Sequence, residues 1–179
     1  MYHFFVEPHQ IGAEEIRIEG ADVNHIRNVL RMKPGEEILI SSREGGDYFC
    51  RVEELEPEYV SAKILEEWEN KELPARIHLF QGLPKGDKME LIIQKAVELG
   101  AYRVVPVSMK RSVVKLDAKK ADAKRKRWNA VSESAAKQSK RSLIPEVAPL
   151  MTYKEAVKEA AGYDMVLLPY ESADGIRKT

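Results

Sequence analysis

Basic side chains collect in the second half of the sequence, where their spacing suits the binding of a polyanion. The stretch from Lys110 to Arg141 holds 12 basic residues and three acidic ones. Within it, Lys120, Lys124 and Arg127 recur at intervals of four and three residues. This spacing places them in a line on one helix face, which could follow a phosphate backbone. A charge run is also typical of a solvated helix face, so the pattern alone leaves both interpretations open.

A glycine-containing loop, Gly82-Leu-Pro-Lys-Gly-Asp-Lys88, offers a second place for a phosphate. It is not a P-loop, because three residues rather than four separate its glycines and aspartate follows the second glycine. It does follow a predicted strand, and open α/β sheets bind ligands at the carboxyl ends of their strands. Lys85 could therefore contact a phosphate there, although a purely structural turn explains the loop equally well.

Three further groups of residues could take part in binding or catalysis. Arg111 follows a predicted strand that ends at Val107, and a guanidinium can bind phosphate through two hydrogen bonds. Glu98 lies three residues after Lys95, which by itself predicts only an exposed ion pair. The last group is polar and basic and falls in two places. Gln138 and Arg141 lie where the predicted long helix ends, and His25, Arg27 and Arg31 lie on or just after a short predicted helix near the amino terminus.

The first 72 residues predict a small, mostly β module. Alternating or apolar runs indicate strands at residues 2–6, 15–19, 36–42, 48–53 and 59–65. Gly45 and Gly46 predict a hairpin between the third and fourth of them. The spacing of Val23, Ile26 and Leu30 predicts one short helix that ends before Pro34. An acidic segment at residues 66–74 then breaks the periodicity and predicts a boundary.

The rest of the chain alternates strands with helices, which predicts a parallel sheet covered on both faces. Strands are expected at 77–81, 104–107 and 164–169, the last of them buried, with helices at 87–99, 118–138 and 152–161. Asp87 and Thr152 are the predicted N-caps of the first and third helices, and Gly100 ends the first. Trp128, Val131 and Ala135 share one helix face, and we favour a packed core over a base-stacking platform for them.

Composition excludes several classes of protein. The chain of 179 residues has 44% hydrophobic and 32% charged residues, as expected of a globular protein. Residues 1–72 carry 8 basic and 17 acidic side chains, and the remainder carries 21 and 12. One cysteine and four scattered histidines argue against a disulfide and a metal site. Without an apolar run long enough for a membrane span or a signal segment, we expect a cytoplasmic protein.

Several motifs in register identify the sequence as similar to the ribosomal RNA small subunit methyltransferase E family. The resemblance runs from Met1 to about Ser172. The motifs that carry it are His25-Ile-Arg-Asn-Val-Leu-Arg31, Leu83-Pro-Lys-Gly-Asp-Lys88, Ile93-Gln-Lys-Ala-Val-Glu-Leu-Gly100, Arg111-Ser-Val-Val-Lys115, Arg127-Trp128 and Gln138-Ser-Lys-Arg141 with Ile144-Pro145.

The resemblance implies an α/β protein in which a PUA-like RNA-binding β-barrel, residues 1–72, precedes a SPOUT (trefoil-knot) methyltransferase domain, incomplete here, at residues 73–179. It implies methylation of N3 of a uridine in 16S ribosomal RNA, with S-adenosylmethionine as cofactor and a homodimer as the working form. We expect Arg111 to stabilise the developing uridine anion or its phosphate, with Glu98 as its orienting group or as a base. The candidate cofactor residues are Pro169, Tyr170 and Glu171, and the candidate RNA-binding residues are His25, Arg27, Arg31, Lys85, Lys120, Lys124, Arg127, Gln138 and Arg141.

Members of this family continue for several dozen residues beyond the strand predicted to end near Pro169. Their additional residues include a G-P-E-G-G segment and a final helix, which tie a knot around the cofactor. The chain ends at Thr179, so we expect a truncated chain in which activity is in doubt. A short, catalytically dead relative is the alternative explanation. The rival function is that of a non-catalytic RNA-binding protein.

Overall fold

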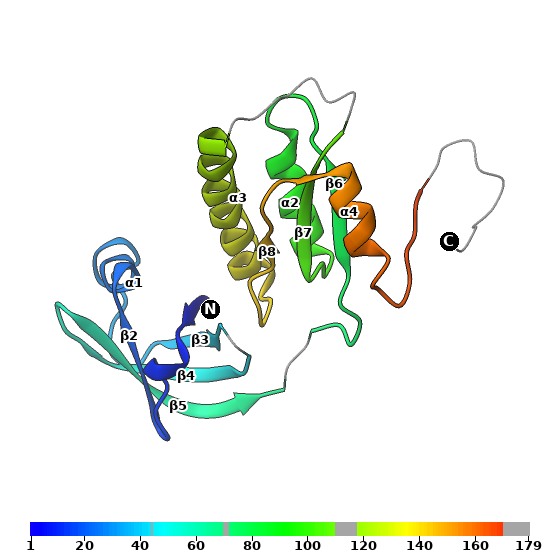
Figure 1. Cartoon of the computed structure of the whole chain (residues 1–179). Coiled ribbons are helices and arrows are strands. Elements are labelled where there is room, and N and C mark those ends of the chain that lie inside the picture. The colour runs from blue at the N-terminus through cyan, green and yellow to red at the C-terminus, as the bar shows by residue number, and fades with distance from the viewer. Residues whose placement is uncertain (44, 70–71, 110–117, 170–179) are drawn as a thin grey trace.

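A computed structural model describes residues 1–43, 45–69, 72–109 and 118–169, which form two sheets connected by a linker (Figure 1). Sheet A has five strands in the order β1-β3-β4-β5-β2. Only the pair β1 and β3 is parallel, and the other neighbours are antiparallel. The strands are β1 Tyr2–Val6, β2 Glu15–Glu19, β3 Glu37–Ser42, β4 Asp47–Leu55 and β5 Tyr59–Trp68, and a short 3-10 helix, Pro8–Gln10, follows β1.

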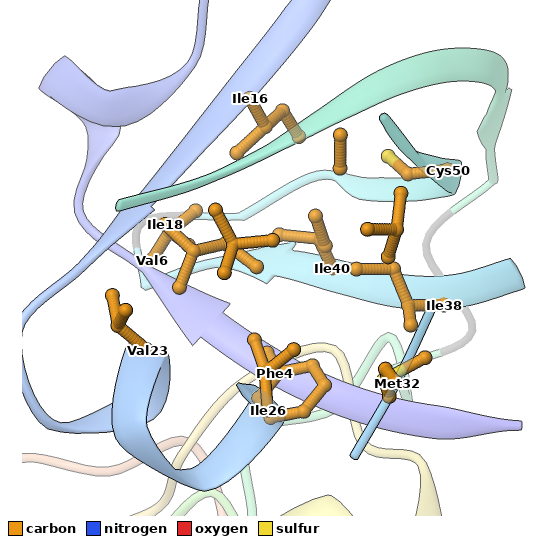
Figure 2. Packing of buried hydrophobic residues seen from close by; sticks show 13 residues of the cluster. Phe4, Val6, Ile16, Ile18, Val23, Ile26, Met32, Ile38, Ile40 and Cys50 are labelled. Atoms are coloured by element: carbon orange, nitrogen blue, oxygen red, sulfur yellow. The ribbon is translucent and has the colours of Figure 1, made fainter. Parts of the chain in front are cut away.

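Alternation of apolar and polar residues builds the core of sheet A. In β2, Ile16 and Ile18 are buried while the flanking residues are exposed, as a period of two requires. They pack with Ile38 and Ile40 of β3 in one cluster, shown in Figure 2. The predicted hairpin is confirmed: β3 and β4 are antiparallel, and Gly46 takes the positive φ of +96° that glycine adopts without strain.

The predicted amino-terminal helix is divided into two parts. An α-helical turn, α1 (Ala21–Asn24), continues into a π-helical segment, η2 (His25–Val29), in which the Leu30 amide donates to the His25 carbonyl. The predicted apolar face is present, since Val23 and Ile26 are buried in the sheet A core. A sequence period of 3.6 does not reveal a local change to i+5 hydrogen bonds.

Sheet B confirms the predicted parallel α/β arrangement. Its strands are all parallel, with β7 paired to β6 on one side and to β8 and β9 on the other. Val104 points to a cluster with α2 and α3, while Val105 and Val107 point to a cluster with α4, so helices cover both faces. The elements are β6 His78–Gly82, α2 Lys88–Glu98, β7 Arg103–Ser108, α3 Ala118–Ser139, β8 Glu146–Val147, β9 Met151–Thr152 and α4 Tyr153–Ala160.

The helix ends follow the predicted signals, with one difference. Thr152 and Glu155 form the predicted capping box of α4, with the Glu155 amide donating to Thr152 Oγ1. Gly100 follows α2 with a φ of +96°. Asp87 is the N-cap residue of α2, but its side chain makes no capping hydrogen bond.

Two predicted strands differ from the structure. Strand β5 continues to Trp68, three residues into the expected linker, where the Trp68 ring stacks on Phe49 at a centroid distance of 5.5 Å. Residues 164–169, expected to form a buried strand, are neither a strand nor buried, and Leu168 is 73% exposed. An apolar run becomes a strand only where a neighbour supplies ladder hydrogen bonds, and no described strand pairs with this segment.

Sheet A packs against α3 and the core that the helices form over sheet B. Phe5 of β1 is buried in the cluster that α2 and α3 form over sheet B. Figure 1 accordingly shows the amino terminus next to the carboxyl-terminal end of α3. Polar contacts join the same surfaces: Ser142 Oγ donates to the Asp47 carboxylate, and Arg43 lies 3.5 Å from Glu133 of α3. This shared core fixes sheet A relative to the long basic helix.

Candidate functional site

Two strands and the start of α3 come together at the carboxyl edge of sheet B. Strands β6 and β7 end side by side, with Gly82 in register with Val107, and the Leu83 amide donates to the Val107 carbonyl at 3.0 Å. Exposed Lys85 lies in the loop that follows β6. Arg111, predicted at this edge, lies outside the described residues, and Met109 is the last described position before it.

The three predicted helix residues Lys120, Lys124 and Arg127 lie in the first half of α3, next to this edge. Lys120 is exposed, and the Lys124 ammonium lies 5.9 Å from the centroid of the Trp128 ring. Arg127 forms an ion pair with Glu90 of α2 at 2.7 Å but is 66% exposed. Exposed pairs of this kind contribute little to stability, so a phosphate can replace the carboxylate.

His25 and Gln138, far apart in the sequence, line one groove. We call it the junction groove: a hollow of about 350 Å³ between β1 and η2 on one side and the carboxyl-terminal end of α3 on the other, lined also by Tyr2, Leu30, Ser134 and Lys140. The His25 ring is exposed and lies edge-on to Phe4, 6.5 Å between centroids. Arg27 and Arg31 are on and just after η2, and Arg31 is exposed with a φ of +55°.

Arg141 is committed to contacts inside the protein. Its Nε donates to both carboxylate oxygens of Glu72 at 2.9 Å, and its Nη1 donates to the carbonyls of Val97 and Ala101 at the end of α2. The side chain is only 10% exposed. This geometry argues against the predicted RNA contact for Arg141, because its donors are already used by Glu72 and by two backbone carbonyls.

The predicted partner of Glu98, Arg111, lies outside the described residues, and the contacts of Glu98 are with other residues of α2. Glu98 accepts from Lys95 Nζ at 2.7 Å and from Gln94 Nε2 at 3.0 Å. These contacts hold the pKa of Glu98 below its usual range, first through the Lys95 hydrogen bond, which makes it a poor base. It also lies at the end of α2, about 15 Å of helix away from the carboxyl edge of sheet B.

The predicted cofactor residues are only partly described. Pro169 is exposed at the end of the 164–169 segment, and Tyr170 and Glu171 lie outside the described residues. Among the residues that the structure describes, no group of three His, Cys, Asp or Glu side chains could hold a metal ion. The described helices also include none that is long and apolar enough to cross a membrane.

Sequence reasoning missed a buried polar chain between the two sheets. His3 Nε2 lies 2.7 Å from Ser41 Oγ, Ser41 donates to Asp47, and Asp47 also accepts from Ser142. Burial lowers the pKa of His3 from 6.5 to about 4, since the loss of hydration outweighs the attraction of Asp47 for the imidazolium. Residues 3–6 of β1 are all buried, so no alternation singles out His3, and only the fold brings Ser142 into the same chain of hydrogen bonds.

This lowered pKa predicts a specific loss of stability in acid. Between pH 6.5 and about 4 the unfolded chain protonates His3 and the folded protein does not, so the free energy of unfolding falls with falling pH. This loss in the free energy of unfolding is absent above pH 6.5 and reaches about 3 kcal/mol near pH 4. Urea unfolding at several pH values checks this, with His3→Gln as the non-titrating control. An equal pH dependence in the two proteins would contradict it.

Comparisons with known proteins identify both parts of the chain. A family model described as an RNA methyltransferase PUA domain matches residues 18–65, and one described as an RNA methyltransferase domain matches residues 71–179. The chain is 39% identical to the ribosomal RNA small subunit methyltransferase E of Bacillus subtilis, over 97% of this chain and 69% of that protein. For the family member of Synechocystis the identity is 30%, over 93% of this chain but only 54% of the relative.

Solved structures confirm the expected fold, a PUA-like half-barrel followed by the parallel methyltransferase sheet. The family member of Neisseria gonorrhoeae, solved bound to S-adenosyl methionine, superimposes with a TM-score of 0.77 at 34% identity, covering 89% of this chain and 66% of that one. A methyltransferase structure from Legionella pneumophila, also with S-adenosyl methionine bound, gives 0.81 at 26% identity, with 96% and 71% covered. The chain therefore belongs to the ribosomal RNA small subunit methyltransferase E family.

Proposed function

We propose that this chain carries the RNA-binding domain and the first part of the catalytic domain of an enzyme that methylates N3 of a uridine in 16S ribosomal RNA. The boundary between the domains lies after Glu72, in the linker between β5 and β6. The observation that carries the proposal is one face of α3, which presents Lys120, Lys124 and Arg127 near the carboxyl edge of sheet B, while Gln138 lines the junction groove at the other end of the helix. Membership of the family supplies the reaction type.

The methyl donor in this proposal is S-adenosylmethionine, as in the two relatives solved with it bound. Pro169, Tyr170 and Glu171 are the proposed cofactor edge. The described residues around Pro169 do not enclose a ligand of this size, because Met165, Leu167 and Leu168 are all largely exposed. The relatives are longer than this chain, which spans 54% to 69% of the two named above, and we place the remainder of the cofactor site in the additional length.

Methylation of a ring nitrogen requires an exposed N3 and loss of its proton. A paired uridine hides N3, so the RNA is single-stranded or splayed at the target. We assign Arg111 the stabilisation of the uridine anion or of its phosphate, because it follows β7 at the ligand-binding edge. Glu98 is better explained as the partner of Lys95 on α2 than as a base.

Methyl transfer to RNA tests the reaction directly. The protein is incubated with radiolabelled S-adenosylmethionine and small-subunit ribosomal RNA, and the modified nucleoside is identified by mass spectrometry. We expect 3-methyluridine. A methyl group on another atom would contradict the N3 assignment. RNA binding without cofactor binding or transfer would support the non-catalytic alternative only in a protein as long as the relatives, because in this chain it fits a fragment equally well.

Replacing Arg111 tests its role in the same assay. We expect Arg111→Ala to lower kcat by about 100-fold or more, the usual effect of removing one donor that stabilises a developing anion. Arg51→Ala, which removes an exposed arginine from β4 of sheet A, is the matched control and should leave kcat unchanged. Activity of Arg111→Ala within about two-fold of the parent would remove it from the mechanism.

Two further parts of the proposal concern assembly and place of action. We propose a homodimer acting on the small ribosomal subunit or its RNA in the cytoplasm, as the family resemblance implies. Light scattering of the purified protein gives the mass of the assembly, and a mass near 20.4 kDa, that of one chain, would contradict the dimer.

A further inference from the structure

We propose that the junction groove holds one unpaired nucleotide of the RNA, remote from the methylated uridine, with its base stacked on Tyr2 and its phosphate next to Lys140. This inference rests on the proposed RNA-binding function and adds to it a site that combines residues of two sequence motifs with Tyr2, which neither motif contains. Tyr2 and Lys140 both line the groove, on β1 and just after α3 respectively.

Tyr2 has the properties of a stacking platform. The next four residues of β1 are buried, yet the Tyr2 side chain is 48% exposed at the groove wall. An aromatic ring that faces solvent beside positive charge is what proteins use to bind single-stranded RNA without strong sequence preference. His25 and the Gln138 amide, exposed in the same groove, add groups that can donate hydrogen bonds to a phosphate or a base edge.

Lys140 provides the positive charge in the groove that is available to bind a phosphate. Lys137 is already paired with Asp22 at 3.5 Å and with Glu133 at 3.1 Å. Lys140 is exposed, and within the described part of the chain no carboxylate pairs with it. It has a φ of +55° directly after α3, a conformation in which glycine is free of strain and lysine is not. Replacing it by glycine therefore removes the charge without harming the fold.

The groove lies at one end of α3, and the carboxyl edge of sheet B lies at the other. Lys120, Lys124 and Arg127 are followed at the same helical spacing by Ser134 and Gln138, with the core residue Val131 between them. At 1.5 Å per residue, the distance along the helix from Lys120 to Gln138 is about 27 Å. A single strand bound along this face would reach the carboxyl edge of sheet B at one end while a flanking nucleotide enters the groove at the other.

Opposite effects on affinity and stability distinguish this site from a structural role. Binding to a fluorescein-labelled oligouridylate of about 12 nucleotides is measured by anisotropy. We expect Tyr2→Ala to weaken binding by about five-fold or more, and Tyr2→Phe, which keeps the ring, to stay within about two-fold of the parent. Lys140→Gly should weaken binding and flatten its salt dependence by about one counterion, while its melting temperature is unchanged or higher.

Matched controls come from α4, which covers the opposite face of sheet B. Tyr153→Ala and Lys154→Gln remove an equally exposed ring and an equal charge there, and should leave binding unchanged. If the unaltered protein binds the oligouridylate and the groove variants bind it as tightly as these controls do, this inference alone is overturned. Failure of the unaltered protein to bind the oligouridylate or ribosomal RNA at low ionic strength would overturn the proposed function with it.

Discussion

Replacing Arg141 by alanine is expected to lower the free energy of unfolding by about 3–5 kcal/mol, the cost of breaking a buried ion pair by removing one partner. The change leaves Glu72, 12% exposed, without its counter-charge. It also leaves the Ala101 carbonyl without the Arg141 donor, whereas the Val97 carbonyl keeps its bond from the Gly100 amide. Because Glu72 precedes sheet B and Arg141 follows α3, the loss loosens the linker as well as the helix packing.

Urea unfolding of the parent and of Arg141→Ala measures this effect. Arg17→Ala is the matched control, since Arg17 pairs with Glu19 at 3.2 Å but both side chains are about half exposed. We expect less than about 1 kcal/mol from that exposed pair. The loss of stability in Arg141→Lys should fall between those of Arg141→Ala and Arg17→Ala, because an ammonium keeps the charge but cannot form the two parallel bonds to Glu72. Equal losses in Arg141→Ala and Arg17→Ala would contradict the structural role.

The contrast between Gln138 and Arg141 shows what a motif does not reveal. Both belong to one polar segment, and the sequence predicts an RNA contact for each. The helix ends at Ser139 and the chain turns through the left-handed Lys140, so Gln138 stays on the outer face while Arg141 turns inward to Glu72. The direction of each side chain depends on a single backbone φ, which the spacing of residues does not encode.

Much of the fold followed from local patterns. Alternation placed β2 within its observed bounds, and the capping box and Gly100 marked where helices begin and end. These signals depend on near neighbours in the sequence. The prediction of a strand at residues 164–169 was wrong because it used only local signals. The apolar residues there satisfy the local pattern, but a parallel strand also requires a partner strand that is distant in the sequence.

The candidate site was predictable where topology alone decides it. Lys85 and the start of α3 lie at the carboxyl edge because loops after parallel strands must reach it. The same argument, applied to α2, would have placed Glu98 at the opposite edge, since a crossover helix runs back along the strands. The junction groove could not be predicted, because it exists only where β1 packs against α3.

Trp128→Ala should cost about 3–5 kcal/mol of stability, the usual range for deleting a buried tryptophan. Trp128 is 4% exposed and shares one cluster with Phe5 from sheet A and Ile93 of α2. Removing the indole therefore opens a cavity in the core between α3, α2 and sheet B. Chemical unfolding measures the loss, and Ala130→Gly, at an exposed position of the same helix, controls for changes in helix propensity of about 1 kcal/mol.

Trp128→Leu separates the core interpretation from the base-stacking one. Leucine keeps an apolar side chain in the cavity but has no aromatic face, so it should reduce stability less than alanine does. If Trp128 is core, the folded Trp128→Leu protein binds the oligouridylate within about two-fold of the parent, whereas loss of a stacking ring would weaken binding about five-fold or more. The expected pattern is the reverse of that for Tyr2→Ala, which should leave the stability of the fold unchanged but weaken binding to RNA. A Trp128→Leu protein that is stable but binds RNA poorly would mean that the indole leaves its buried position to contact a base.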